Sequence, residues 1–289
     1  MGWLLVYAVI SQIGFATTMR IAFDRGGVSI YTHAELLFQV PYGILAASIL
    51  TVLMPRVSRA AGLGDHGAVA ADLALGARYL SVALIPITMA MALLGPSFTA
   101  LVFTGRVDAD AAAMIGTAVA CSAFGLAPFA LVMLQMRVFY AYNDTRTPAL
   151  LNLVMVTTKV SILVAAATLL TDRTVIVIPS DASSLASVVG AADGHILLRR
   201  RRGLLGFSTV ATTITRVCGA TVLVGATGFG AVVLTYTSLD LGHLEQITAL
   251  TAGTAGTAGT AAAIVAFATS AYVIEIPELR TVRNLLARR

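Results

Sequence analysis

The residues with the clearest chemical potential are ionisable side chains that stand within long apolar stretches. Arg20, Glu35 and Lys159 are of this kind. A charged group inside a membrane span costs about 2.5–3.5 kcal/mol on insertion scales, and such groups are functional candidates by default. Gln39 follows Glu35 by one helical turn, so the two residues predict a polar stripe. That stripe either lines a water-filled cavity or makes interhelical hydrogen bonds.

Lys159 is the deepest of these groups and must face either protein or water, where it could pair with an acid. Asp193 is one candidate acid, and structural pairing explains both residues as well as a role in transport does. Arg20 stands near the end of its apolar stretch, where a long side chain can also snorkel to the interface. Glu35, Gln39, Arg20 and Lys159 are therefore the cavity candidates, with the structural alternatives open for each.

No catalytic or metal-binding constellation accompanies these residues. The sequence has no G-x-S-x-G, no H-E-x-x-H and no glycine-rich phosphate loop after a strand. Its four histidines fall in four separate regions, which argues against a metal site. Cys121 and Cys218 lie in apolar runs without metal-ligand spacing, which predicts buried, inert thiols. We expect neither an enzyme nor a bound cofactor or metal.

The elements that must hold these residues are membrane-spanning helices. Hydrophobic residues make up 58% of the 289-residue chain and charged residues 11%, against about 25% charged residues in an average soluble domain. This composition excludes a soluble enzyme. A span needs about 20 mostly apolar residues. The sequence therefore predicts an all-α polytopic integral membrane protein with about eight transmembrane helices, near residues 3–23, 29–55, 76–103, 110–141, 149–171, 181–199, 209–236 and 247–275.

Arginines predict the orientation of these helices. Twelve of them lie in alternate connections and in the C-terminal tail, whereas the other connections hold three. The run from Arg199 to Arg202 is typical of a cytoplasmic stop signal, which we favour over a nucleic-acid partner. By the positive-inside rule, we expect a multi-pass protein of the plasma membrane with both termini in the cytoplasm.

The connection between the fourth and fifth spans carries a specific string of residues. It reads R-x-F-Y-A-x-x-D-T-R-T-P and contains Arg137, Phe139, Tyr140, Asp144, Thr145, Arg146 and Pro148. Physically, Asp144 and Thr145 cap a helix in which Pro148 suits the first turn. The string closely resembles the signature of the MurJ/MviN lipid II flippases. These belong to a larger superfamily of multidrug, oligosaccharidyl-lipid and polysaccharide exporters, and the bias toward arginine resembles an actinobacterial or mycobacterial member.

The resemblance covers essentially the whole chain but only part of the family pattern. Family members have two lobes, and this chain resembles the C-terminal transmembrane lobe over residues 1–275, followed by a cytoplasmic basic tail at 276–289. The resemblance thus implies a missing N-terminal lobe as a partner. Leu36 stands where many relatives carry an arginine, so the anion-binding role of that arginine does not transfer to this position.

The resemblance implies a lipid II flippase, or half of one. Such a protein moves the lipid-linked disaccharide-pentapeptide precursor from the cytoplasmic to the outer leaflet by alternating access. Membrane lipids would surround the protein. No cofactor is expected, and a coupling ion or the membrane potential would supply the energy. Two alternatives stay open: a truncated, non-transporting membrane scaffold, and another polysaccharide-lipid exporter of the superfamily.

Overall fold

The computed structural model describes residues 2–103, 107–169, 177–202, 214–215 and 217–219. The expected span at 247–275, the tail at 276–289 and all but five residues of the expected span at 209–236 lie outside these ranges. Statements about the fold below concern the described residues.

The described chain is helical throughout, which confirms the prediction of an all-α membrane protein. Its helices in chain order are α1 (Gly2–Asp24), α2 (Val28–Pro41), η1 (Tyr42–Ala46), α3 (Ala47–Gly62), α4 (His66–Phe103), α5 (Ala109–Ser122), η2 (Ala123–Gly125), α6 (Leu126–Ala141), α7 (Arg146–Leu169) and α8 (Ile178–Arg202).

Five helical stretches of the described chain are long and apolar enough to cross a membrane. They are Gly2–Asp24, Val28–Gly62, His66–Pro96, Asp110–Ala141 and Arg146–Leu169. The α8 helix is more polar and is not one of these five. A total of eight spans therefore stays a prediction.

Two of the long stretches change helix type along their length. The stretch Val28–Gly62 contains the π-helical turn η1, which directly follows Pro41. Proline has no amide hydrogen and disturbs the regular ladder of hydrogen bonds, so a local change of winding is expected there. The stretch Asp110–Ala141 contains the 3₁₀ turn η2 between α5 and α6. The η2 turn directly follows Ser122, which lines the polar cavity described below.

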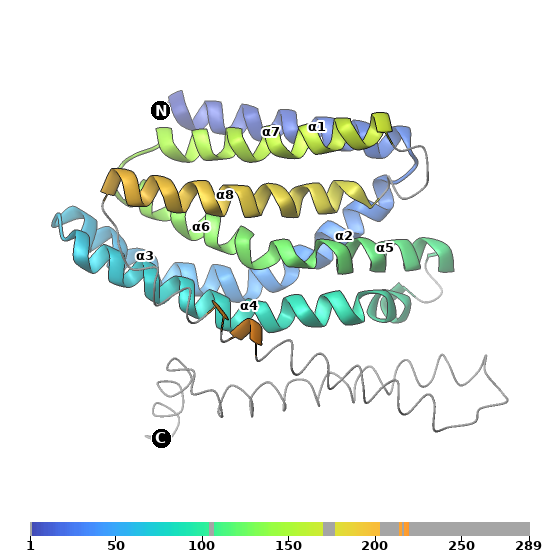
Figure 1. Ribbon diagram of the computed structural model, residues 1–289, viewed down its shortest axis with the longest axis horizontal. Helices are drawn as coiled ribbons and strands as arrows, with labels where there is room; N and C mark the ends of the chain where they lie inside the picture. The colour runs from blue at the N-terminus through green and yellow to red at the C-terminus, as the bar shows by residue number, and fades with distance from the viewer. Residues whose placement is uncertain (1, 104–106, 170–176, 203–213, 216, 220–289) are drawn as a thin grey trace, which may run out of the picture.

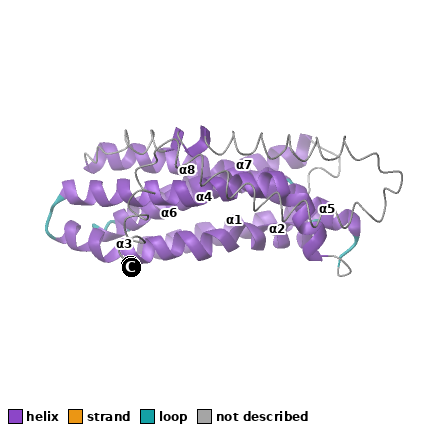
Figure 2. Ribbon diagram, turned by 90° about the horizontal axis from the view of Figure 1, so that it is seen from below, coloured by secondary structure: helices purple, strands orange, loops and turns teal. Residues whose placement is uncertain are grey.

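The helices form an elongated bundle and run roughly along its long axis (Figures 1 and 2). The α1 helix packs against α7, α7 against α8, and α8 against α6. On the other side, α4 packs against α3, α5 and α6, and α2 packs against α5. Segments far apart in sequence, such as α1 and α7, thus lie side by side (Figure 1).

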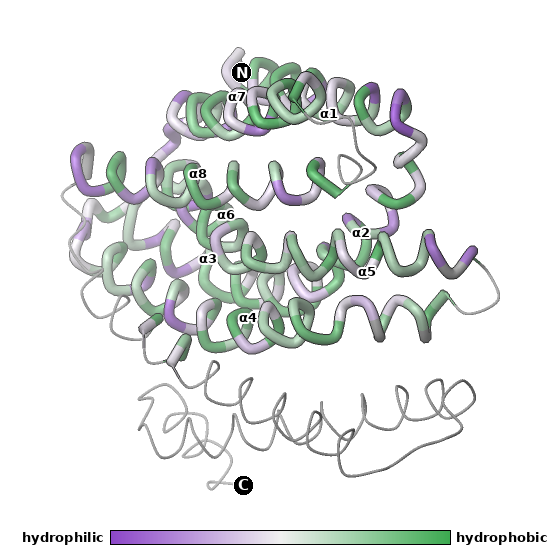
Figure 3. The backbone as a smooth tube through the Cα atoms, turned by 45° about the vertical axis from the view of Figure 1, so that its right-hand side comes forward, coloured by the Kyte–Doolittle hydropathy of each residue, from purple (hydrophilic) through white to green (hydrophobic). Residues whose placement is uncertain are grey.

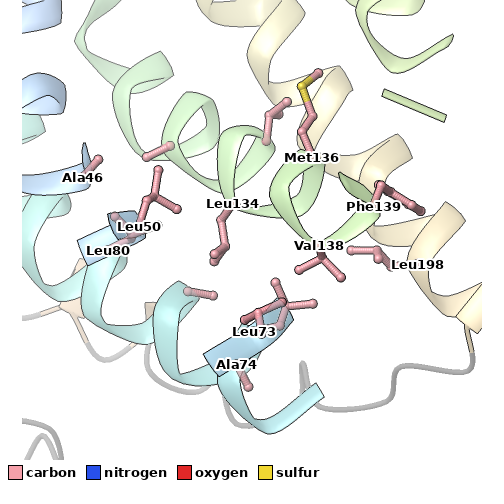
Figure 4. Close-up of a cluster of buried hydrophobic side chains, with 14 of the residues drawn as sticks. Ala46, Leu50, Leu73, Ala74, Leu80, Leu134, Met136, Val138, Phe139 and Leu198 are labelled. Carbon is pink, nitrogen blue, oxygen red and sulfur yellow. The ribbon is translucent and has the colours of Figure 1, made fainter. Parts of the chain in front are cut away.

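The main apolar core lies between α3, α4 and α6 and includes one residue of α8. Leu50, Leu73, Leu134 and Leu198 are almost completely buried there, and Phe139 is fully buried (Figure 4). Apolar side chains on the outside of the bundle, such as Leu5 on α1, are exposed and suit contact with lipid. Hydrophilic residues gather toward the ends of the helices (Figure 3).

The two cysteines differ from the sequence-based prediction. Cys121 on α5 and Cys218 are both exposed, so the prediction of buried thiols was wrong. Cys121 shares the exposed face of α5 with Ala113 and Thr117, and a thiol behaves as a small apolar side chain that suits a lipid-facing position as well as a protein core.

Candidate functional site: a polar cavity between helices

A cavity of about 180 Å³ lies between α2, α6, α7 and α8 in the described part of the chain. Its apolar wall includes Phe38, Phe129 and Met155. Its polar wall consists of Glu35, Ser122, Asn152, Lys159, Ser180, Ser183, Ser184 and Ser187. Two of the four predicted cavity residues, Glu35 and Lys159, therefore line one cavity although they are far apart in sequence.

Lys159 reaches from α7 to α2. Its Nζ atom donates a hydrogen bond to the Tyr31 hydroxyl at 3.3 Å and lies 5.5 Å from the centre of the Tyr31 ring. Tyr31 itself is only 4% exposed. Among the described residues, the ion pairs are Arg20–Asp24 and Arg56–Asp72. Lys159 therefore makes no ion pair with Asp193, and Tyr31 is its direct partner instead.

Glu35 and Gln39 form the polar stripe that their spacing predicts. Gln39 Nε2 donates a hydrogen bond to Glu35 Oε1 at 2.9 Å. Tyr31, Glu35 and Gln39 follow one another at intervals of four residues, and they pass from buried through half-buried to exposed. Glu35 also interacts electrostatically with Lys159. The stripe thus leads from the Lys159 ammonium to the surface of the bundle.

Arg20 lies away from this cavity. Its Nε atom is 3.3 Å from the Asp24 carboxylate one turn further along α1, and both side chains are more than half exposed. Leu36 is likewise exposed and is not part of the cavity wall.

Neutral polar residues supply much of the cavity wall and were not among the predicted site residues. Ser180, Ser183, Ser184 and Ser187 lie at intervals of three and four residues on α8, which places them on one face of the helix. Asn152 lies two turns before Lys159 on α7 and bridges to α1, where its Nδ2 donates to the Tyr7 carbonyl and to Ser11 Oγ. The regular spacing of the serines on α8 was the feature of the sequence from which this polar wall could have been predicted.

The signature loop has a structural role. Asp144 Oδ1 accepts hydrogen bonds from the backbone amides of Arg146 and Thr147 at 3.1 and 3.0 Å, so it caps α7 as the sequence predicts. The Arg146 guanidinium lies 5.4 Å from the centre of the Trp3 ring, which ties the loop to α1. Asn143 has a φ of 57°, which an asparagine tolerates well in a tight turn.

The remaining signature residues anchor both sides of the turn. Phe139 is fully buried in the core, and Pro148 is buried in the first turn of α7. Arg137, Tyr140 and Thr145 are half-buried around them. The loop therefore fixes the corner between α6 and α7, at the opposite end of α7 from its connection to α8 (Figure 1).

Comparisons with known proteins agree on one protein family. A family model described as lipid II flippase MurJ matches residues 1–249. A probable lipid II flippase MurJ of Rhizobium meliloti is 27% identical over 155 residues, which are 53% of this chain and 29% of the relative. The lipid II flippase MurJ of Burkholderia cenocepacia is 28% identical over 156 residues, which are 53% of this chain and 30% of the relative.

The fold is shared with a solved flippase. A structure of lipid II flippase MurJ in an inward closed conformation matches with a TM-score of 0.72 at 14% identity, and the match covers 94% of this chain and 53% of that chain. The chain thus spans about half the length of the solved protein. Since the family model covers well over half of the chain, the chain belongs to the lipid II flippase MurJ family.

Proposed function

We propose that this chain forms one lobe of a lipid II flippase, which carries the lipid-linked disaccharide-pentapeptide precursor across the plasma membrane. The match of the MurJ family model to residues 1–249 is the observation that carries this proposal. The chain covers 53% of the solved flippase, so a second lobe of similar size completes the transporter. The lobes alternate access to a site between them, as in other transporters built from two halves.

Within this lobe, the stripe of Glu35 and Gln39 faces the passage of the polar headgroup. Glu35 is half-buried, and Gln39 is exposed and joined to it by a hydrogen bond, so the pair offers polar atoms at the surface of α2. Lys159 lies behind this stripe and supplies positive charge that offsets the Glu35 carboxylate. Arg20, paired with Asp24, serves at the membrane interface.

The proposal includes the orientation of the chain and its energy source. Arg56 and Arg59 lie in the second half of α3, Arg137 lies near the end of α6, and Arg146 begins α7. The α3–α4 and α6–α7 connections that these helix ends flank lie at the same end of the bundle as the C-terminal end of α8 (Figure 1). This clustering supports a cytoplasmic position for that end and for both termini. A coupling ion or the membrane potential drives the cycle.

Complementation tests the proposed activity. Cells depleted of their own lipid II flippase are supplied with this chain alone, or with this chain together with the N-terminal half of a MurJ relative. We expect growth from the pair, because the passage forms between two lobes. If neither combination restores growth although the chain is inserted in the membrane, the flippase proposal is wrong and a non-transporting scaffold is favoured.

The stripe is tested in the combination that restores growth. Glu35→Gln removes the negative charge and keeps the shape, and Asp24→Asn makes the same change outside the cavity. Hydrogen bonds to charged groups contribute about 1.5–3 kcal/mol, so we expect precursor translocation to fall roughly tenfold or more for Glu35→Gln. Asp24→Asn should leave it unchanged. Equal translocation by both variants would remove Glu35 from the passage.

A further inference from the structure

Three serines of the cavity wall have already used their hydroxyl hydrogen atoms. Ser183 Oγ donates to the Pro179 carbonyl at 2.8 Å, and Ser187 Oγ donates to the Ser183 carbonyl at 2.9 Å. Ser184 Oγ donates to the Ser122 carbonyl at 2.6 Å. A hydroxyl has one hydrogen and two lone pairs, so these three side chains can still accept hydrogen bonds but have no hydrogen left to donate.

Asn152 and Glu35 also offer acceptors to the cavity. Asn152 uses both hydrogens of its amide, one for the Tyr7 carbonyl at 3.1 Å and one for Ser11 Oγ at 2.9 Å, so its Oδ1 atom remains an acceptor. Glu35 is acceptor-only when ionised. The Oγ atom of Ser180 is buried and has no partner within the described part of the chain, so this hydroxyl can donate or accept. Apart from Ser180 and Lys159, the polar wall therefore offers acceptors and one negative charge, which suit a group that donates hydrogen bonds and carries positive charge.

Lys159 has the chemistry that this wall requires. An ammonium group has three hydrogens, and one of them goes to the Tyr31 hydroxyl at 3.3 Å. The Tyr31 ring also lies 5.5 Å from the charge, within the range of a cation–π interaction. One carboxylate together with neutral acceptors balances a single positive charge. The described residues contain no group of three His, Cys, Asp or Glu that could hold a multivalent metal.

We propose that the acceptors of this cavity wall form a binding site for a primary ammonium group, and that the ammonium of the chain's own Lys159 occupies it from the α7 side. The bound ammonium neutralises Glu35 inside the bundle, where an unpaired charge is costly. It also joins two helices that pack mainly against other partners, since α2 packs against α5 and α7 packs against α1 and α8. Lys159 is thus an internal ligand that holds α2 to α7.

Chemical rescue tests the proposal on the purified full-length chain. Lys159→Ala empties the position of the ammonium, and we expect the apparent Tm in detergent to fall by about 5 °C because Glu35 loses its counter-charge. Ethylammonium chloride should restore most of this loss. Tetramethylammonium chloride at the same concentration carries the same charge without N–H donors and should not. The original chain should respond equally to both salts.

Two further variants isolate the site. In Lys159→Ala combined with Glu35→Gln, ethylammonium should no longer stabilise the chain, because the anionic acceptor is gone. Arg20→Ala removes a cation outside the cavity and should show no specific response to ethylammonium. If Lys159→Ala yields little folded protein, the yield of monodisperse protein purified with each salt gives the same comparison.

Several outcomes would overturn the proposal. They are an unchanged Tm in Lys159→Ala, equal restoration by tetramethylammonium or sodium, and stabilisation of the original chain by ethylammonium. The measurement needs no transport activity, so its result is independent of the complementation result.

Discussion

At the scale of single residues, the pair formed by Arg56 and Asp72 shows how a buried charge can depend on an exposed one. Arg56 Nη2 lies 2.7 Å from Asp72 Oδ1. The Arg56 side chain is 61% exposed, whereas that of Asp72 is 9% exposed. The pair joins the end of α3 to the start of α4. Arg56 therefore has a second role besides its contribution to the positive charge at this end of the bundle.

Removal of Arg56 should destabilise the protein more than removal of Arg20. Arg56→Gln leaves the Asp72 carboxylate buried without its counter-charge, which costs about 1–3 kcal/mol. Arg20→Gln breaks an exposed pair between residues one turn apart, and such pairs contribute only about 0.3–0.5 kcal/mol. Thermal unfolding of the two purified variants in the same detergent measures the difference. Equal Tm values for both would show that the Asp72 carboxylate does not depend on Arg56.

Sequence alone could find the charged members of the site but not their neutral partners. Glu35 and Lys159 stand out because ionisable groups are rare in apolar helices, and the Asp144 cap follows from local chain chemistry alone. Tyr31 and Ser184 give no such signal, since hydroxyl side chains are common in membrane helices. Their roles depend on which helix faces become neighbours, and a packing of distant segments such as α2, α7 and α8 is not encoded in local spacing.

At the scale of elements, the short turn η2 depends on Gly125. A Cβ atom at this position would lie 2.5 Å from the Cα atom of Ser184 and would also meet the Ser184 side chain. The α8 backbone thus packs directly on η2, and Ser184 Oγ donates to the Ser122 carbonyl at 2.6 Å at the same contact. This contact closes one side of the polar cavity.

Gly125→Ala should separate α8 from η2 and loosen the cavity wall. Because the obstructing atoms include backbone, we expect overpacking to cost about 1–3 kcal/mol. Gly43→Ala is a suitable control, since Gly43 lies in the other irregular turn, η1, and a Cβ atom there meets nothing within 4 Å. Thermal unfolding of the two variants should show a lower Tm for Gly125→Ala alone. A Tm unchanged in both would mean that α8 moves aside without cost.

The elements themselves followed well from apolar runs, whereas their ends and irregular turns did not. The α4 helix begins at His66, whereas the span was expected to begin near residue 76. The Asp65 side chain accepts a hydrogen bond from the Ala68 amide at 2.9 Å and so caps the helix at this earlier start. Apolar content marks the part of a helix that suits lipid, while caps determine where the helix starts.

At the scale of the whole molecule, the fold brings the arginine-rich connections together. The long helical stretches run in alternating directions, and α2–α3 and α5–α6 each form one such stretch. The α3–α4 and α6–α7 connections therefore lie at one end of the bundle and the C-terminal end of α7 lies at the other (Figure 1). The proposed orientation therefore places two equally exposed leucines on opposite sides of the membrane. Leu63, between α3 and α4, and Leu169, at the end of α7, are each 79% exposed.

Cysteine labelling measures this orientation directly. Leu63→Cys and Leu169→Cys are each introduced into a chain that also carries Cys121→Ser and Cys218→Ser, so each variant has one thiol. A membrane-impermeant maleimide added to intact cells should label the cysteine at 169 and not the one at 63, because the positive-inside rule places the arginine-rich end in the cytoplasm. After permeabilisation both should be labelled, which controls for reactivity. The reverse pattern in intact cells would invert the proposed topology, and labelling of both before permeabilisation would contradict a single orientation.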